Sequence, residues 1–228
     1  MRCAALLFVS CIVLKSTFAS DHAAPAKPQS AEEAKAEAAA IWADLLEGNK
    51  RFVAGTCQTR PVVDQRKTLA KGQKPKVVVL ACADSRVAPE LVFDKSLGEL
   101  FVIRIAGNIA DKTALGSIEY AVEHLDSKLI VVLGHEKCGA VAAAASSEEM
   151  PSNNLKELMK KIRPALKQLK TDAKGDELYM AQIHANAKHS AQDLLKNSEI
   201  LKKAVASNRI TVVPAVYKLE SGEVAKTE

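Results

Sequence analysis

Four short apolar segments, rich in β-branched residues, alternate with helix-forming sequence along this chain of 228 residues. Continuous apolar runs are typical of parallel strands covered on both faces, whereas half-exposed strands alternate apolar and polar residues. Strands that alternate with helices predict an α/β fold. We therefore expect a mainly parallel four-stranded β-sheet core flanked by helices, with an N-terminal helical arm. The predicted strands are residues 76–82, 100–106, 128–134 and 210–217.

The segments between the predicted strands have helical composition. The sequence EEAKAEAAAIWADLLEGNKRFVAG predicts a helix that ends near Gly48 or Gly55. Residues 113–127 predict a crossover helix between the second and third strands. Residues 152–208 predict at least two amphipathic helices, and Pro164 is expected to kink or split the first of them. The sequence does not indicate what these later helices do beyond covering the sheet.

The N-terminus indicates export. Residues 1–19 combine a positive residue, an apolar stretch from Cys3 to Leu14 and small residues before a plausible cleavage site, which is typical of a signal peptide. About 12 apolar residues are too few for a membrane anchor, which needs roughly 20. Acylation of Cys11 as a lipoprotein is the alternative, but the residues before it match that pattern poorly. We expect an exported protein, located in a bacterial periplasm.

A linker and one domain are expected to follow the leader. Residues 20–31, SDHAAPAKPQSA, are small, polar and proline-bearing, and predict a flexible linker. Residues 32–228 have a suitable length for a single domain. The net charge of the whole chain is +5, and it falls to +3 without residues 1–19, which hold two bases and no acids. This mild charge does not indicate nucleic-acid binding or stable membrane association.

The cysteines point to a metal site rather than a disulfide framework. Of five cysteines, three remain after the leader, Cys57, Cys82 and Cys138, and an odd number suits disulfide pairing poorly. Cys82 ends the first predicted strand, and GHEKCGA places His135 and Cys138 after the third. Ligand sites in parallel sheets gather at the carboxyl ends of strands. Two thiolates and an imidazole suit Zn²⁺, although buried cysteines are often only small hydrophobic residues.

The sequence resembles the β-class carbonic anhydrases. The resemblance rests on LLEGNKRFVAG, GQKPKVVVLACADSR, LGELFVIRIAGNIA, SIEYAVEHL, IVVLGHEKCGAV and, more loosely, VVPAVYKLESGEV, which together span residues 45–224. It implies one zinc ion per chain, held by Cys82, His135 and Cys138. It also implies a homodimer or a dimer of dimers, with the active site near the subunit interface, and reversible hydration of CO₂ to bicarbonate and a proton through a zinc-bound hydroxide.

The resemblance also implies a role for the pair Asp84 and Arg86 beside the metal. Asp84 would orient the nucleophile, and Arg86 would keep Asp84 ionised through charge-assisted hydrogen bonds. The alternative for an isolated D-x-R is a surface salt bridge that caps a helix. Some relatives use this carboxylate as a fourth ligand at low pH. That subgroup has a tryptophan where this chain has Val79, although Arg104 matches another part of its regulatory site, so we expect an open site that admits water.

Other residues match the plant-type subgroup. Gln73 would donate to a substrate oxygen, and Phe101 and Tyr120 of the partner subunit would help to form an apolar slot for CO₂. Gly139, next to the third ligand, completes the expected substrate-binding residues and allows close backbone approach. The alternatives are a loop glutamine and two core aromatic residues.

Two other functions remain open from sequence. The same fold and metal could hydrolyse carbon disulfide or carbonyl sulfide, because the width of the slot depends on loops that the sequence does not place. A non-catalytic periplasmic zinc-binding protein would need a fourth strong ligand or lack the orienting pair. No further Cys or His lies near the expected ligands in sequence.

Overall fold

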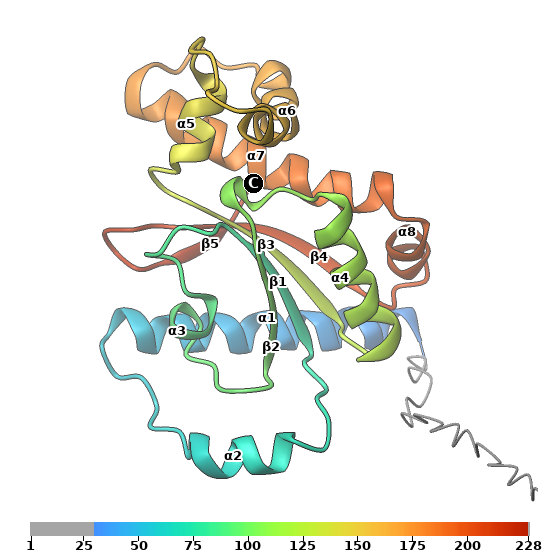
Figure 1. Cartoon of the computed structure of the whole chain (residues 1–228). Helices are drawn as coiled ribbons and strands as arrows, with labels where there is room; N and C mark the ends of the chain where they lie inside the picture. The colour runs from blue at the N-terminus through green and yellow to red at the C-terminus, as the bar shows by residue number, and fades with distance from the viewer. Residues whose placement is uncertain (1–29, 228) are drawn as a thin grey trace, which may run out of the picture.

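A five-stranded sheet forms the centre of the protein. The computed structural model of the chain describes residues 30–227. The strand order is β2-β1-β3-β4-β5, and the first four strands are parallel (Figure 1). The strands are β1 (Val77–Ala81), β2 (Leu100–Arg104), β3 (Leu129–His135), β4 (Thr211–Tyr217) and β5 (Val224–Lys226).

Alternate residues of the central strands enter separate cores on the two faces of the sheet. Val78 and Leu80 of β1 pack with α4 (Lys112–His124) and α8 (Glu199–Ala206). Val77 and Val79 face the opposite way, toward α1 (Ala31–Val53) and α3 (Pro89–Val92). Because both faces are covered, all five residues of β1 are buried, which explains its continuous apolar sequence.

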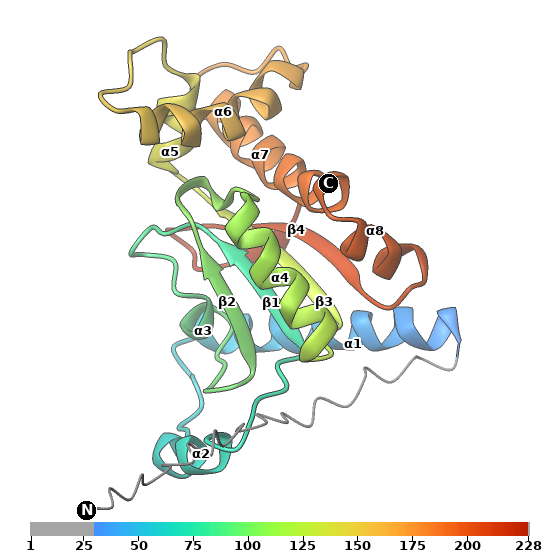
Figure 2. The ribbon, with the colours of Figure 1, turned by 45° about the vertical axis from the view of Figure 1, so that its right-hand side comes forward.

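A third core lies beyond the carboxyl ends of the strands. It joins Cys82 and Cys138 to apolar residues of α5 (Gly139–Ala145), α6 (Asn153–Gln168) and α7 (Gly175–Asn197). Figure 2 shows α5 and α6 extending past this end of the sheet, with α7 running back along it. The helices that follow the third strand in sequence therefore enclose the edge at which the metal ligands are expected.

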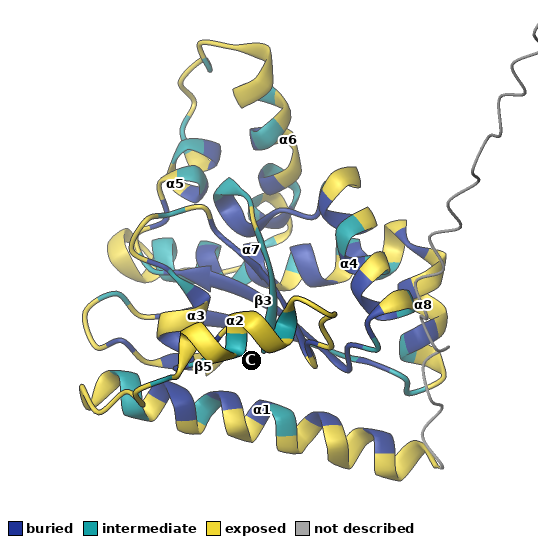
Figure 3. Ribbon diagram, turned by 60° about the horizontal axis from the view of Figure 1, so that its bottom comes forward, coloured by how far each residue is buried: buried dark blue, intermediate teal, exposed yellow. Residues whose placement is uncertain are grey.

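The remaining elements are short or peripheral. The 3-10 helix η1 (Ala106–Asn108) follows β2, and α2 (Val62–Leu69) precedes β1. No residue of α2 is buried, and Figure 3 shows it as an exposed segment. Among residues 30–227, no helix is both long and apolar enough to span a membrane.

The predicted sheet is confirmed in its parallel part and incomplete at one edge. The four expected strands appear within two residues of their predicted bounds, but β5 was not predicted. It is antiparallel to β4, has only three residues and buries only Val224, so it carries no periodic signal.

The predicted helices also differ in detail. The first helix is not interrupted at Gly48 and runs from Ala31 to Val53, with the Ser30 hydroxyl accepting a hydrogen bond from the Glu33 N–H as N-cap. Pro164 does not split the helix, because α6 continues through it to Gln168, and the alternative of a kink at Pro164 stays a prediction. The expected signal peptide and most of the expected linker lie outside the described residues.

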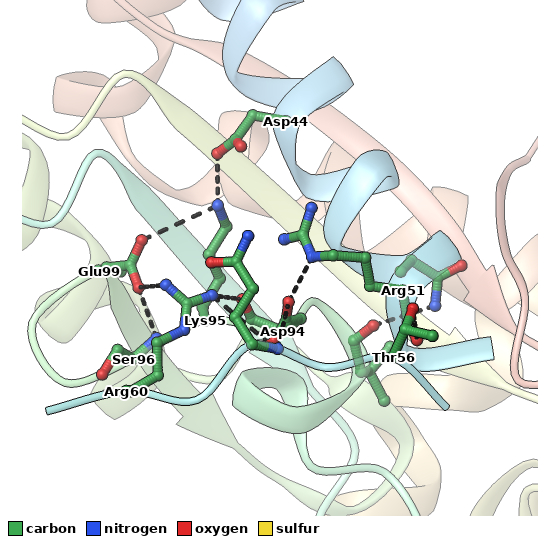
Figure 4. Close-up of polar contacts among 11 residues, drawn as sticks. Asp44, Arg51, Thr56, Arg60, Asp94, Lys95, Ser96 and Glu99 are labelled. Atoms are coloured by element: carbon green, nitrogen blue, oxygen red, sulfur yellow. Dashed lines mark hydrogen bonds and ion pairs between the residues drawn. The ribbon is translucent and has the colours of Figure 1, made fainter. Parts of the chain in front are cut away.

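A buried carboxylate joins α1 to the segment after α3. Asp94 is 6% exposed and has a positive φ of 46°. It accepts hydrogen bonds from Arg51 Nε at 2.5 Å and from the Gln58 N–H at 3.2 Å, and Arg60 lies within 3.5 Å (Figure 4). Burial alone would raise the pKa of Asp94, but its bonds to Arg51 and Gln58 hold the pKa below its usual value.

Candidate metal centre

The parallel strands bring the three expected ligands together. Cys82 directly follows β1, and His135 ends the neighbouring β3. Cys138 is the N-cap of α5, in a tight turn where Lys137 has a positive φ of 51°. One ligand atom from each residue lies within 4.8 Å of the other two, and all three residues are buried. This confirms that the three residues meet at the carboxyl edge of the sheet.

The His135 ring is oriented for coordination through Nε2. Its Nδ1 lies 2.7 Å from the Glu136 carbonyl oxygen, which can only accept, so Nδ1 carries the proton. Nε2 is then a lone-pair donor, and it is completely buried without a hydrogen-bond partner. A buried nitrogen without a partner is costly unless a ligand binds it. A hydrogen bond from the other ring nitrogen to a carbonyl oxygen is a usual way in which a metal-binding histidine is held.

The two cysteines form a closely coupled pair. A hydrogen bond from Cys138 and another from the Gly107 N–H lower the pKa of Cys82 despite its burial. The pKa of Cys138 is raised, because it donates to Cys82 and because it is buried. A divalent cation would replace the shared proton and favour both thiolates. Two thiolates and one imidazole in a tetrahedral arrangement suit zinc and leave a fourth position.

Asp84 and Arg86 lie beside the ligands as a bidentate pair. Arg86 donates to both carboxylate oxygens, through Nε at 2.9 Å and Nη2 at 2.7 Å, and the Arg86 N–H adds a third bond. These bonds hold the pKa of Asp84 far below its usual value. Asp84 Oδ2 is 3.8 Å from His135 Nε2, yet the carboxylate is not a member of the ligand cluster. The pair therefore faces the metal position and does not cap a helix.

Three further side chains support the ligands through backbone contacts. Arg104, at the end of β2, donates to the carbonyls of Cys82 at 3.1 Å and Asp84 at 2.6 Å. Tyr179 donates to the carbonyl of Cys138. Asn186 donates to the carbonyl of Gly107, whose N–H reaches the Cys82 sulfur. Sequence reasoning missed the roles of Tyr179 and Asn186, because neither lies in a motif.

The expected CO₂-binding residues are not brought to the ligands within a single chain. Gln73 lies exposed in the loop between α2 and β1. Phe101 is half-buried on the edge strand β2, where it packs against the hydrophobic core between the sheet and the helices α4 and α8. Tyr120 is 43% exposed on α4, so its alternative role as a core residue is wrong for this chain. Their role in substrate binding stays a prediction.

Two sequence details have a plain outcome. A methyl group added at Gly139 would meet nothing within 4 Å, so the expected close backbone approach does not occur within this chain. Cys57 is exposed, forms no disulfide and is not a member of the ligand cluster.

The comparisons with known proteins agree with this geometry. A family model described as carbonic anhydrase matches residues 77–224. The chain is 40% identical over 189 residues to carbonic anhydrase 2 of Mycobacterium tuberculosis, covering 80% of this chain and 89% of that protein. It is 38% identical over 190 residues to a carbonic anhydrase of Mycolicibacterium smegmatis, covering 81% and 91%.

The fold is also similar to that of solved structures. A Coccomyxa β-carbonic anhydrase in complex with acetazolamide superposes with a TM-score of 0.65 at 25% identity, and the match covers 84% of each chain. The β-carbonic anhydrase CcaA superposes with the same score at 26% identity, covering 82% of this chain and 87% of that one. The parallel strands and the flanking helices are therefore shared with these proteins.

Proposed function

Because the chain belongs to the carbonic anhydrase family and has the β-class fold, we propose that it catalyses the reversible hydration of CO₂ at a zinc ion. The observation that carries the proposal is the buried cluster of Cys82, His135 and Cys138, with the partnerless Nε2 of His135 inside it. Zinc bound there would supply a Lewis acid that acidifies water and so provides a nucleophile near neutral pH.

The protein residues around the cluster would orient the reaction. Asp84 Oδ2 faces the metal position and can accept a hydrogen bond from the nucleophile. Arg86 occupies both carboxylate oxygens, so Asp84 stays ionised throughout the neutral range and remains beside the ligands. Asp84 therefore acts as a fixed acceptor, and any titration of activity near neutrality must come from another group. This arrangement supports an open site.

A second copy of the chain would complete the substrate side of the site. Phe101 lies on an edge strand, and both Tyr120 and Gln73 are exposed, so all three are available to a partner. We propose a homodimer or dimer of dimers in which these residues contribute to the CO₂ slot of the neighbouring subunit. Mixing the inactive variants Cys82→Ser and Tyr120→Ala should then restore activity, because one mixed site keeps both residues. Unrestored activity in a verified heterodimer would argue against a shared site.

The other two functions raised by the sequence lack support. The matched relatives are carbonic anhydrases, and none of those described above acts on carbon disulfide or carbonyl sulfide by name. A purely structural zinc site would need a fourth protein ligand, whereas the cluster in the described residues has three and keeps the orienting pair. Export to the periplasm remains a proposal that rests on the composition of residues 1–19.

Stopped-flow CO₂ hydration on zinc-loaded protein tests the proposal. The wild type should accelerate hydration, with activity rising through an apparent pKa of about 7. Cys82→Ser should lose zinc and activity together, whereas Asp84→Asn should keep zinc and lose turnover. Asp126→Asn is a matched control, because this carboxylate pairs with Lys128 away from the cluster. A zinc-loaded wild type no faster than buffer would show that the proposed function is wrong.

A further inference from the structure

Helix α7 makes one hydrogen bond to the ligand residue Cys138 and one to Gly107 in η1, the residue whose N–H reaches the sulfur of Cys82. Tyr179 Oη donates to the Cys138 carbonyl at 2.8 Å, and Asn186 Nδ2 donates to the Gly107 carbonyl at 2.8 Å. The two residues are seven positions apart, which is two helical turns, so they lie on one face of α7. We infer that α7 is a positioning element for the two thiolates, with Asn186 acting on Cys82 through Gly107 and Tyr179 acting on Cys138.

The link from Asn186 to Cys82 passes through a tightly enclosed glycine. The Gly107 N–H lies 3.3 Å from the Cys82 sulfur, and its φ of 71° belongs to the left-handed region. A methyl group at Gly107 would lie 2.6 Å from Ile162 Cδ1 and 3.3 Å from Ala140 Cβ. The residue is therefore enclosed by α5 and α6, and Asn186 fixes its carbonyl from the third side. These contacts hold the Gly107 N–H toward the Cys82 sulfur.

The environment makes this hydrogen bond important for the ligand. Cys82 is 4% exposed and Asn186 is 1% exposed, so water cannot replace either partner freely. A buried thiolate is stabilised by each N–H that points at it, and the Gly107 N–H points at the Cys82 sulfur. Without Asn186 the Gly107 carbonyl loses its donor, and the glycine can rotate away from the sulfur.

The second link should be weaker than the first. The Cys138 carbonyl also accepts from the N–H groups of Val141 and Ala142 in the first turn of α5. Tyr179 adds a bond to a carbonyl that is already held, so its loss moves Cys138 less than the loss of Asn186 moves Gly107. We therefore expect substitution of Asn186 to affect metal binding more than substitution of Tyr179.

The test uses metal binding and cobalt spectroscopy, and it rests on the proposed zinc site without needing CO₂ turnover. Asn186→Ala should raise the zinc Kd, measured by chelator competition, by about 10- to 100-fold. In cobalt-substituted protein its thiolate-to-metal charge-transfer band should move to longer wavelength, because a sulfur without a hydrogen bond gives up charge more easily. Tyr179→Phe should change both quantities in the same direction by less.

Asn49→Ala is the matched control. Asn49 is also a buried asparagine, 5% exposed, and its amide bonds the Val92 and Gly222 carbonyls on the far side of the sheet from α7. This variant should lower Tm and leave the zinc Kd and the cobalt band unchanged. An equal spectral change in Asn49→Ala would show that general destabilisation is the cause and overturn the inference.

The remaining outcomes are also decisive. An unchanged Kd and band in folded Asn186→Ala would overturn the inference alone, since the wild type would still bind metal through both thiolates. If Asn186→Ala does not fold, Tyr179→Phe decides, because it removes one hydroxyl and keeps the ring packed. A wild type without thiolate-to-cobalt bands would overturn both the inference and the proposed zinc site.

Discussion

Gly48 lies inside α1 at the point where this helix crosses the segment after α3. A methyl group at Gly48 would overlap the carbonyl oxygen of Phe93 and lie 2.8 Å from its carbonyl carbon. The obstacle is backbone, which cannot turn aside as a flexible side chain can. The next residue, Asn49, binds the carbonyls of Val92 and Gly222 and accepts from the Val224 N–H. These three hydrogen bonds hold α1 close to the backbone after α3, and the methyl group would have to push the two apart.

The expected cost of Gly48→Ala follows from these contacts. Alanine would favour the helix by about 1 kcal/mol. Overpacking against a rigid neighbour costs about 1–3 kcal/mol. A shift of α1 would also weaken the Asn49 bonds, each of which contributes about 1 kcal/mol net. We expect a net loss of about 3 kcal/mol in the free energy of unfolding.

Urea unfolding of metal-free protein at fixed concentration would measure the change. Gly116→Ala is the matched control, because Gly116 also lies inside a helix, α4, and a methyl group there would meet nothing within 4 Å. That substitution should stabilise by about 0.5–1 kcal/mol. Two substitutions of identical chemistry should therefore have opposite signs. A stabilising or neutral Gly48→Ala would refute the close approach of α1 to Phe93.

Three further predictions concern charge and metal. In metal-free protein, Asp94→Asn should be less stable than the wild type at pH 7. Because the pKa of Asp94 is lowered in the folded state, this difference in stability should persist above about pH 4 and shrink as acid protonates the wild-type carboxylate. Measuring the Tm of both proteins across acidic pH would test this. Zinc at 1,000 times its Kd should stabilise the wild type by about 4 kcal/mol, measured by thermal unfolding with and without chelator, and Cys138→Ser should not respond. Arg104→Lys should lower the kcat of CO₂ hydration without lowering Tm, because lysine cannot donate in a fork to the carbonyls of Cys82 and Asp84, and an unchanged kcat would contradict this role.

The sequence was sufficient to predict the ligand cluster because each step uses local pattern. Continuous apolar runs indicate buried parallel strands, and parallel strands end at one edge of a sheet. Cys82 directly follows one such run, His135 ends another, and Cys138 lies three residues after His135. The meeting of Cys82 and His135 is therefore a consequence of strand direction, and the short turn after β3 adds Cys138 to the cluster.

Elements stabilised by tertiary contacts were not predictable in the same way. The strand β5 has three residues and pairs only with β4, so its existence depends on the turn that returns the chain. Pro164 stays within α6 because Ile162 and Ala165 are buried against neighbouring elements on either side of it. Packing of that face stabilises the helix despite the missing N–H.

The supporting shell of the metal centre shows the same limit most clearly. Asn186 reaches Gly107 across 79 residues, and Tyr179 reaches Cys138 across 41. In both contacts a side chain donates to a backbone carbonyl, and every residue type has this carbonyl. The accepting residue can therefore be of any type. A motif therefore cannot reveal them, even though a ligand displaced by half an ångström would bind zinc less well. Helix α7 therefore has an ordinary helical sequence and is still expected to influence the metal. It contributes two hydrogen-bond donors, Tyr179 and Asn186, from one helix face that packs along β3 and β4.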